Sequence, residues 1–398
     1  MHILVVNVGS TSFKYKLLDM PAEQVMAEGR LERIGSDESP VEFRSGDHHD
    51  RATARLPDYA AAIRRMMDDL TGPGSPVHTL DEVHAVGFKT VILDGTPGCY
   101  LLSPDIVERM EAMNNIAPAH NPLYVQAVRQ MAELFPALPL IGLFESAFHV
   151  TMPDYAATYG VPWEWKEKYG VRRLGFHGAS HRYVSEAAPK LAGKDPGNCR
   201  LISAHLGGSS SLCATLNGKS IDTSMGMSPQ SGVDHATRNG DLDVFALLHV
   251  MDREALHTGD ARRILCKQAG LAGVSGTSGD VRDLEAAAEA GSDRARLALE
   301  MFCYSVKKTI GAYAAALGGL DVIGLAGGIG ERGVKVRERV LRGLEFLGVY
   351  LDSARNAAHT GQEGIISTDD SPVAVVVVRT NEELVVAREA YALLSRSR

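Results

Sequence analysis

The sequence predicts a duplicated α/β fold of two domains with a ligand site in the cleft between them, and three observations lead to this prediction. The chain has 398 residues, more than one hydrophobic core usually serves, so two domains are expected. Strand-like apolar runs are interspersed with amphipathic helical patterns, which is typical of α/β proteins. One hairpin pattern occurs near the start of the chain and again close to its middle, which indicates a repeated architecture.

The repeated pattern is an apolar strand, a polar residue, a short turn of small residues and a second strand. It reads ILVVNVGSTSFKYKLLD at residues 3–19 and LISAHLGGSSSL at residues 201–212, with His205 in the place of Asn7. A Gly/Ser turn of this kind can direct several backbone N–H groups and hydroxyls at one point, which forms an anion-binding nest. An ordinary hairpin is the alternative for each copy taken alone, and chance is a competitor because few positions match.

The first half of the chain continues from its hairpin with an antiparallel meander expected through residues 29–53. Helical periodicity is clear in LPDYAAAIRRMMDDL at 56–70, which stops at a Thr-Gly-Pro-Gly turn. The segment APAHNP is a rigid, proline-bracketed turn that carries His120. Apolar spacing predicts the other elements of this half, namely strands at 83–91 and 138–144 and helices at 105–114 and 121–134.

The second half opens with three strands, the last two joined by Asn217-Gly218, a strong hairpin signal. A strand at 321–325 runs into the glycine cluster 327–330 and a helix expected at 336–347. This is a nucleotide-type turn, although weaker than a full G-x-G-x-x-G. The remaining expectations are a helix opened by residues 172–181, helices at 242–252, 259–269 and 297–317, a loop at 273–283, a strand at 372–378 and a final helix after residues 380–383.

Composition narrows the class of protein. The chain is 45% hydrophobic and 23% charged, as globular proteins are, and its net charge of −8 argues against nucleic acid or an anionic membrane as a partner. No apolar run is long enough to span a membrane, and the N-terminus does not resemble a signal peptide. The five cysteines are scattered without any C-x-x-C, so neither a disulfide framework nor a zinc site is expected, and a reducing cytoplasm is.

Several polar residues at element ends admit a functional and a structural interpretation. Glu145 directly follows a buried strand, where α/β proteins build their sites, but it could equally cap a helix. Lys89 lies on the strand at 83–91 and is an ordinary solvated lysine unless it points into a cleft. Asp280 and Arg282 precede a helix, which they could cap or where they could hold a ligand.

Two further patterns near helix starts also admit a functional and a structural interpretation. His177 and His181 stand four residues apart, but Gly178 interrupts the spacing and no third ligand is evident, so a zinc site is not expected. Thr380 with Glu383 fits a capping box, which leaves Glu382 for other work.

Eight phrases of the sequence carry a family resemblance that runs over essentially the whole chain. They are NVGSTSFK, IAPAHNP, ESAFHVTMP, KYGVRRLGFHGASHRYVS, GKSIDTSMGMSPQSG, TRNGDLD, GGIGE and TNEELVVARE. The chain resembles the acetate kinases, within the superfamily of sugar kinases, Hsp70 and actin. The resemblance implies a duplicated actin-like (ribonuclease H-like) fold, with one domain of residues 1–150 plus 384–398 and a nucleotide-binding domain of residues 151–383.

The resemblance also implies an activity. Members of this family transfer a phosphoryl group between ATP and a short-chain carboxylate, giving an acyl phosphate and ADP. Such a transfer depends mainly on positioning and on neutralisation of charge, aided by Mg²⁺. The implied cofactors are therefore ATP/ADP and Mg²⁺, and the implied setting is a homodimer in the cytoplasm.

Residue roles follow from the positions that match the family's phrases. The implied catalytic residues are Arg238, His177, Lys89, Glu145 and His120. The implied nucleotide and phosphate residues are Asn7, Ser10, Ser12, Lys14, His205, Gly207, Gly208, Asp280, Arg282, Gly328, Ile329 and Gly330. Val91, Ala119, Phe176 and Pro229 are the implied acyl pocket, and Asn7 and Glu382 are the residues associated with the metal.

The chain departs from the family pattern at several of these places. Lys89 replaces a second active-site arginine, which keeps the charge but loses the planar two-pronged grip. Ala119 replaces a leucine, which should enlarge the acyl pocket. The other departures are Glu145 for aspartate, Gly208 for asparagine, Asp234-His235-Ala236 for an apolar and glycine run, and Arg332 for asparagine.

These departures leave three hypotheses for function. The first is a kinase for acetate or a close short-chain acid. The second is a kinase for a bulkier or polar carboxylate, prompted by Ala119, Lys89 and the Asp234-His235 pair. The third is a nucleotide-binding protein that has lost catalysis, although Arg238, His177 and Glu382 are retained. Pyrophosphate as the phosphoryl donor is a further alternative.

Overall fold

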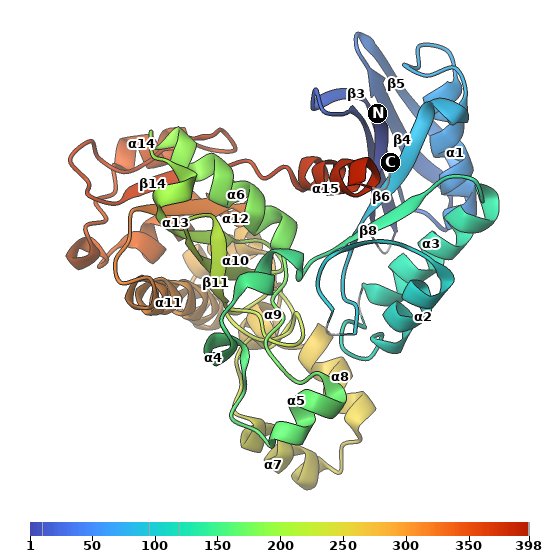
Figure 1. Ribbon diagram of the computed structural model, residues 1–398. Helices are drawn as coiled ribbons and strands as arrows, with labels where there is room; N and C mark the ends of the chain where they lie inside the picture. Colours follow the sequence, from blue (N-terminus) through green and yellow to red (C-terminus); the bar gives the residue numbers. More distant parts are fainter. Residues whose placement is uncertain (10, 95, 119, 397–398) are drawn as a thin grey trace. The chain divides into compact units, whose positions relative to one another are not determined.

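A computed structural model describes residues 1–9, 11–94, 96–118 and 120–396 of the chain (Figure 1). The chain forms two compact units. Unit 1 consists of Met1–Ala147 together with Asn381–Arg398, and unit 2 consists of Phe148–Thr380. The expected boundaries lay three residues further along the chain at both crossings, so Glu382, expected in the C-terminal domain, belongs to unit 1.

Unit 1 is built on an eight-stranded sheet with the order β5-β4-β3-β2-β1-β6-β8-β7. The hairpin predicted at 3–19 is its centre, because β1 pairs antiparallel with β2 on one side and parallel with β6 on the other. The expected meander is the antiparallel run from β2 to β5. The strands are β1 (His2–Val8), β2 (Ser12–Asp19), β3 (Gln24–Glu32), β4 (Ser36–Ser45), β5 (His48–Leu56), β6 (Val83–Thr90), β7 (Cys99–Leu101) and β8 (Leu140–Phe144).

The helices of unit 1 pack on this sheet. Helix α15 (Glu382–Arg396), from the end of the chain, packs against β1 and β6. Gly87 in β6 allows this close approach, because a Cβ at that position would lie 2.8 Å from the Val386 side chain. The other helices are α1 (Tyr59–Thr71), η1 (Leu80–Glu82), α2 (Pro104–Ala112) and α3 (Asn121–Leu134), the last with the bounds predicted from its periodicity and with Pro122 in its first turn.

Unit 2 is built on a six-stranded sheet with the order β11-β10-β9-β12-β14-β13. Its first three strands are the predicted central hairpins, and β9 pairs antiparallel with β10 and parallel with β12. The strands are β9 (Arg200–His205), β10 (Ser211–Leu216), β11 (Lys219–Thr223), β12 (Val322–Ala326), β13 (Gly364–Ile365) and β14 (Ala374–Val377).

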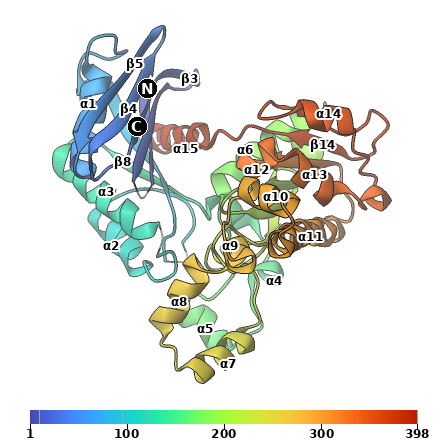
Figure 2. The same ribbon diagram turned by 180° about the vertical axis from the view of Figure 1, so that it is seen from behind.

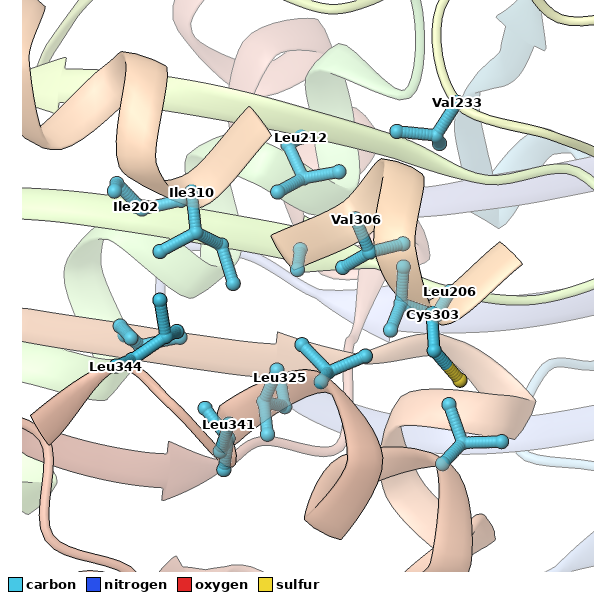
Figure 3. Packing of buried hydrophobic residues seen from close by; sticks show 14 of the residues in the cluster. Ile202, Leu206, Leu212, Val233, Cys303, Val306, Ile310, Leu325, Leu341 and Leu344 are labelled. Carbon is cyan, nitrogen blue, oxygen red and sulfur yellow. The ribbon is translucent and has the colours of Figure 1, made fainter. Parts of the chain in front are cut away.

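Side chains alternate across the two faces of this sheet, as strand geometry requires. Ile202 and Leu206 belong to the larger core, which Figure 3 shows together with Val306 and Ile310 of α11 (Asp293–Ala316). Leu201 of the same strand belongs to a smaller cluster packed with α6 (Gly178–Leu191). The remaining helices on the larger core are α9 (Gly270–Ser275), α10 (Val281–Glu289), α12 (Gly327–Arg332), α13 (Val334–Leu341) and η4 (Glu345–Leu347).

The two sheets share one topology. The order β3-β2-β1-β6-β8 in unit 1 corresponds to β11-β10-β9-β12-β14 in unit 2, with the same pattern of antiparallel and parallel neighbours. A further antiparallel strand, β7 or β13, lies beside the last strand of each set. The fold is therefore the duplicated actin-like (ribonuclease H-like) α/β fold that the resemblance implied.

A group of short helices in unit 2 stands apart from its core. Helices α5 (Trp163–Tyr169) and α7 (Val244–Glu254) contain no buried residue, and both views draw them side by side, away from the sheet (Figures 1 and 2). Trp163, Val244 and Phe245 are 57%, 64% and 78% exposed. The other short helices of this unit are η2 (Ala147–Thr151), α4 (Asp154–Ala157), η3 (Pro196–Asn198), α8 (Thr258–Lys267) and α14 (Ser353–Ala358). The first residue of η2, Ala147, is the last residue of the first segment of unit 1. No described helix is long and apolar enough to cross a membrane.

Three local expectations were wrong. The loop expected at 273–283 contains the end of α9, which starts at Gly270. The helix expected at 336–347 ends at Leu341, because Gly343 has a φ of 84° and leads into the separate turn η4. Thr380 does not cap the last helix, because Asn381 Oδ1 accepts from the Leu384 N–H at 3.2 Å and the Thr380 hydroxyl donates to Ser180 instead.

Candidate active site

The β1–β2 hairpin of unit 1 is braced from α3. The Tyr124 hydroxyl donates to Asn7 Oδ1 at 3.1 Å and accepts from the Val8 N–H at 3.3 Å. Burial raises the pKa of Tyr124 to about 12, so it stays a neutral donor. Ser12 begins β2, and its carbonyl accepts from the Gly9 N–H at 2.8 Å to close the turn.

Two other predicted residues, Lys14 and Ser10, belong to the same hairpin. Lys14 pairs with Asn7 across the hairpin and is exposed, as the sequence pattern indicated. Ser10, predicted in the turn itself, lies outside the described residues.

Lys89 lies between two carboxylates in unit 1. Its Nζ is 2.5 Å from Glu382 Oε2 and 3.3 Å from Glu145 Oε1, and the Glu145 and Glu382 side chains are only 8% and 13% exposed. Burial alone would lower the pKa of Lys89, but the two carboxylates outweigh it and hold this pKa well above its usual value. Lys89 is thus a charged group in an ion cluster and not a solvated surface lysine.

The three members of this cluster come from three distant segments. Lys89 is near the end of β6, Glu145 follows β8, and Glu382 opens α15. Because β6 and β8 are parallel neighbours, their carboxyl ends meet at one edge of the sheet, which brings the first two together. Glu145 therefore lies at the carboxyl edge of the sheet, beside Lys89.

In unit 2 the Gly207–Ser210 turn joins β9 to β10 and is held by the glycine helix α12. The Leu206 carbonyl accepts from the Ile329 N–H at 2.8 Å and the Gly330 N–H at 3.3 Å. Gly327 has a φ of 75°, and a Cβ there would lie 2.6 Å from that same carbonyl, so only glycine fits. The predicted glycine turn is thus the first turn of a helix packed against the Gly/Ser turn.

The segment that replaces the family's apolar and glycine run secures the other side of the Gly/Ser turn. His235 is fully buried, and its Nδ1 accepts from the Ser210 N–H at 3.0 Å. The Ala236 N–H donates to the Gly208 carbonyl at 3.0 Å. Burial, reinforced by the charge of Arg238, lowers the pKa of His235 to about 3, so it remains a neutral acceptor.

Arg238 lies against the same turn. Its Nη1 donates to Ser209 Oγ at 3.0 Å and to the Pro229 carbonyl at 2.9 Å, and neither partner carries a charge. Burial lowers the pKa of this guanidinium from its ordinary value without a neighbouring carboxylate to restore it. A partly desolvated cation with uncharged partners, beside a Gly/Ser turn, is suited to receive an anion.

His177 precedes α6 and stands over the end of β9. Its backbone is left-handed, with a φ of 55°, and its ring stacks on that of His205 with the centroids 4.3 Å apart. His205 Nδ1 lies 2.8 Å from Ser180 Oγ, which in turn accepts from the Thr380 hydroxyl at 3.0 Å. The two predicted histidines therefore form one stacked pair tied to α6.

A chain of serine and histidine side chains continues from His177 into the interior. His177 Nδ1 lies 2.7 Å from Ser211 Oγ, and His181 Nε2 lies 2.8 Å from the same oxygen. His181 Nδ1 is 2.7 Å from Ser203 Oγ. Burial lowers the pKa of His181 well below its usual value, so His181 itself is neutral.

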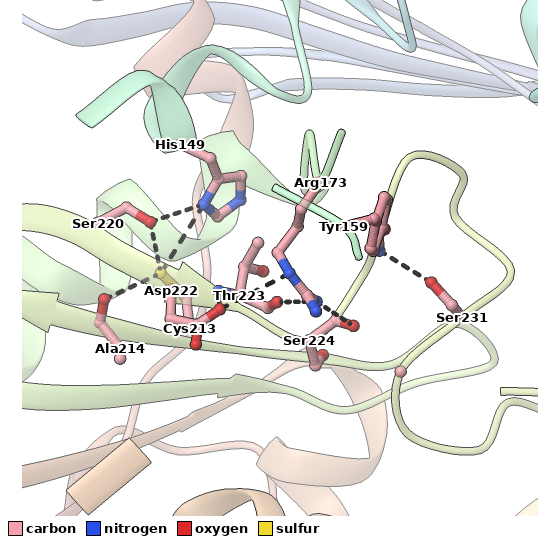
Figure 4. Close-up of polar contacts among 12 residues, drawn as sticks. His149, Tyr159, Arg173, Cys213, Ala214, Ser220, Asp222, Thr223, Ser224 and Ser231 are labelled. Carbon is pink, nitrogen blue, oxygen red and sulfur yellow. Dashed lines mark hydrogen bonds and ion pairs between the residues drawn. The ribbon is translucent and has the colours of Figure 1, made fainter. Parts of the chain in front are cut away.

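A third buried histidine, His149 of η2, supports this network. His149 Nε2 lies 3.0 Å from the carbonyl of Phe176, the residue before His177, and its Nδ1 lies 2.9 Å from Ser220 Oγ (Figure 4). Burial lowers the pKa of His149 to about 4. In the same region Arg173 Nη1 donates to the Thr223 carbonyl at 2.7 Å, where the chain leaves β11 (Figure 4).

The predicted nucleotide-side residues divide between two places. Asp280 is the N-cap of α10, accepting from the Arg282 N–H at 2.9 Å, and it also pairs with the Arg282 guanidinium at 2.6 Å. Asp280 therefore caps this helix, and Arg282 is its ion-pair partner. Gly328 and Ile329 lie in α12, whose carbonyl at Gly330 accepts from the fully buried Arg337 at 3.0 Å.

The predicted pocket residues are mostly apolar and covered. Val91 and Phe176 are 8% and 2% exposed, and Pro229 contributes the carbonyl bound by Arg238. His120 immediately precedes α3, at its N-cap position. Ala119 lies outside the described residues.

Sequence reasoning missed the groups that hold the predicted side chains in place. Tyr124, Ser211, His181 as a network member, His235 and Arg337 were not assigned such roles. A signal was present for part of this set, because Ser203 and His205 alternate along β9 and face the same side as Ser211, the side on which α6 packs. His177 stands immediately before that helix and His181 lies four residues later in its first turn.

Each unit carries a small-residue turn on the equivalent hairpin of a duplicated actin-like fold, and in unit 2 that turn faces an arginine and a histidine pair. Together the fold and the site define a phosphoryl-transferring protein of the class that uses this duplicated architecture. No group of three or more described His, Cys, Asp or Glu residues is arranged to hold a metal by itself.

The chain belongs to the acetokinase family, whose model matches residues 2–388. It is 43% identical to an acetate kinase of Phocaeicola vulgatus over 399 residues, which cover all of both chains. The crystal structure of Porphyromonas gingivalis acetate kinase has a TM-score of 0.87 at 37% identity, covering 99% of each chain. A propionate kinase from Francisella tularensis has a TM-score of 0.88 at 33% identity, covering 98% of each. The chain is a carboxylate kinase, a phosphotransferase with a carboxyl group as acceptor, in a family of ATP-dependent kinases.

Proposed function

We propose that this chain reversibly transfers the γ-phosphoryl group of ATP, in the presence of Mg²⁺, to acetate or a close short-chain acid. The observation that carries the proposal is the position of Arg238, whose guanidinium lies on the Gly207–Ser210 turn and has only uncharged partners there. An anion that arrives at this turn gains a charge-assisted hydrogen bond from Arg238.

The residues of unit 2 then have distinct tasks. Arg238 holds the carboxylate or the transferring phosphoryl group through two N–H groups and neutralises the charge that grows on the equatorial oxygens. His177 donates a hydrogen bond to the phosphoryl group in transfer, with His205 stacked behind it. His205, Gly207 and Gly208 line the phosphates, while Asp280, Arg282 and the helix of Gly328, Ile329 and Gly330 form the adenosine side.

The residues of unit 1 hold the remaining groups. Asn7, Ser10, Ser12 and Lys14 act on the phosphates, and Lys89, Glu145 and His120 act at the carboxylate end. Glu382 and Asn7 offer a carboxylate and an amide oxygen, the hard ligands that Mg²⁺ takes in proteins together with phosphate oxygens and water, so the donor set fits the ion. When bound, Mg²⁺ neutralises phosphate charge. The acyl group packs against Val91, Ala119, Phe176 and Pro229.

The test is an acyl-phosphate trapping assay on the purified full-length chain. Mg-ATP is incubated with acids from formate to butyrate and with hydroxy and amino acids, and the product is captured with hydroxylamine. A signal that peaks at acetate supports the proposal. Silence across the panel, with pyrophosphate also tried as donor, would contradict it and favour a nucleotide-binding protein that has lost catalysis.

A second candidate, a kinase for a bulkier or polar acid, is favoured by Ala119, where the family has leucine. We predict that Ala119→Leu shifts the preference toward acetate by about 1–3 kcal/mol per methylene of the larger acid, since a filled pocket excludes that volume. The measurement is kcat/KM for acetate, propionate and butyrate in both proteins. Unchanged selectivity would mean that residue 119 does not face the acyl group.

We further propose that the protein is a cytoplasmic homodimer whose interface includes α5 and α7. These helices expose Trp163, Trp165 and Phe245, a set of aromatic side chains that an interface with a second copy would cover. We predict that Phe245→Glu raises the dissociation constant of the dimer by at least about tenfold, because it buries a charge in the interface. Sedimentation equilibrium measures this, with the exposed Phe346→Glu as the matched control; a monomeric wild-type chain would refute the dimer.

A further inference from the structure

Lys89 and the candidate metal ligand Glu382 form the tightest ion pair of the unit 1 cluster. The Lys89 ammonium lies 2.5 Å from Glu382 Oε2, and it also contacts Glu145 at 3.3 Å. All three side chains are largely shielded from water, with exposures of 21%, 13% and 8% for Lys89, Glu382 and Glu145. The Lys89 ammonium therefore neutralises part of the charge of both carboxylates.

The ammonium and a divalent cation cannot both sit against the same carboxylate oxygen of Glu382. Two positive charges within about 4 Å repel strongly where water is largely excluded, so one must leave before the other binds. A lysine can leave, because its compact ammonium ends a flexible four-carbon stem, whereas a planar guanidinium would grip both carboxylates together. Glu145 remains within reach of the departing side chain and keeps it charged.

We propose that Lys89 is an internal counter-ion that occupies Glu382 in the metal-free protein and exchanges it for the substrate carboxylate when the metal ion binds. This inference rests on the proposed function, in which Glu382 holds Mg²⁺ and Lys89 faces the acid. It adds a coupling to that function: the metal ion releases Lys89 for the acid, and the acid draws Lys89 from Glu382.

The exchange has a reciprocal consequence. If the metal ion strengthens binding of the acid by some factor, the acid must strengthen binding of the metal ion by the same factor. Binding at this cluster is then ordered by charge, since neither Glu382 nor Lys89 is left without an opposite partner at any stage. The arginine that the family has at this position does not provide this exchange as readily.

The experiment measures Mn²⁺ binding to the full chain without nucleotide, by the loss of the free-ion signal in electron paramagnetic resonance. Lys89→Met should bind Mn²⁺ at least about tenfold more tightly than the wild type, because the competing charge is gone. Lys16→Met is the matched control. It removes the lysine that pairs with the adjacent Glu383 at 3.9 Å, changes the net charge equally, and should leave Mn²⁺ affinity within about twofold.

Acetate supplies the second readout. Saturating acetate should tighten Mn²⁺ binding several-fold in the wild type and should have no such effect in Lys89→Met, which has no ammonium to exchange. Equal Mn²⁺ affinity in the wild type and Lys89→Met, or an acetate effect that survives the substitution, would overturn the inference. Circular dichroism checks that Lys89→Met is folded. If it is not, Lys89→Arg is measured in its place, and tighter Mn²⁺ binding in Lys89→Arg would likewise overturn the inference.

Glu382→Gln separates this inference from the function on which it rests. If Glu382→Gln abolishes Mn²⁺ binding while Lys89→Met does not alter it, the metal role of Glu382 stands and the exchange fails. If Glu382→Gln binds Mn²⁺ as the wild type does, Glu382 does not hold the ion and the metal assignment of the proposed function fails as well.

Discussion

Each unit of this protein places a cation near its repeated hairpin, but the two cations have opposite surroundings. Lys89 in unit 1 contacts the two carboxylates of Glu145 and Glu382. Arg238 in unit 2 contacts the Ser209 hydroxyl and the Pro229 carbonyl, which are uncharged. The pKa of Lys89 is raised because the two carboxylates outweigh its burial, whereas burial lowers the pKa of Arg238.

The difference shows that the same topology can surround a cation either with carboxylates or with uncharged groups. In unit 2 these two partners of the Arg238 guanidinium are uncharged, so its charge is available to an incoming anion, and the buried His181 and His235 are neutral. In unit 1 the charge is already balanced, so an anion must compete for it. The duplicated fold therefore fixes where the hairpins lie, while the electrostatics of each hairpin depend on side chains from other elements.

The largest effect that we predict is a loss of stability at low pH, caused by the buried histidines of unit 2. His149 and His235 of unit 2 have pKa values lowered to about 4 and about 3, and that of His181 is lowered well below its usual value. Below about pH 6.5 the unfolded chain binds protons at these positions and the folded chain does not, so stability falls as the pH falls. His149 alone accounts for a loss of about 3 kcal/mol between pH 6.5 and pH 4.

The measurement is urea unfolding at pH 7, 6 and 5, followed by tryptophan fluorescence. Both tryptophans, Trp163 and Trp165, lie in α5 of unit 2, so the signal reports that unit. His149→Gln should reduce the slope of stability against pH, whereas His257→Gln at an exposed position should not. Equal slopes in the wild type and His149→Gln would show that His149 takes up its proton in the folded state.

The next effect tests the available cation of unit 2. We predict that Arg238→Ala lowers kcat at least about 100-fold, as loss of one preorganised charge donor does at other sites. Arg263→Ala, which removes an exposed arginine of α8 in the same unit, is the control and should leave kcat unchanged. Steady-state kinetics with the preferred acid measures both, and a nearly unchanged rate in Arg238→Ala would remove this residue from the mechanism.

The smallest effect that we predict concerns the contacts of Ser211 with His177 and His181. Ser211 has one hydroxyl proton and two histidine partners, so one of His177 and His181 must donate to it, which couples their tautomers. Ser211→Ala removes this coupling and should lower kcat roughly tenfold, part of the ~10²–10⁴-fold that a positioned proton donor contributes.

The control for this variant is Ser220→Ala, which loses the contact with His149 but none with His177. The pH profile of kcat should also change in Ser211→Ala and not in the control, because only the former alters what His177 Nδ1 faces. Identical profiles in the two variants would mean that the tautomer of His177 does not depend on Ser211.

Much of the fold could be predicted because its signals are local. The two hairpins, the meander and α3 follow from apolar spacing and turn residues within a few positions. One failure arose from a competing group elsewhere in the chain. Thr380 fits a capping box in sequence, yet its hydroxyl contacts Ser180 of α6, and Asn381 caps the helix in its place.

The candidate site was harder to predict for a physical reason. The family resemblance named Lys89, Glu145 and Glu382 separately, but only the folded chain shows that they form one ion cluster across three segments. His235 departs from the family pattern, and nothing local indicates that it accepts the Ser210 N–H. Long-range pairs of this kind leave no periodic trace in a sequence.

The return of α15 to unit 1 has a consequence for how this chain is made. Unit 2 is one continuous segment, whereas unit 1 needs α15 from the end of the chain to cover β1 and β6. Domains fold as they emerge during synthesis, so unit 2 can reach its final state first. The strands β1 and β6 therefore stay uncovered by α15 until the whole of unit 2 has been synthesised.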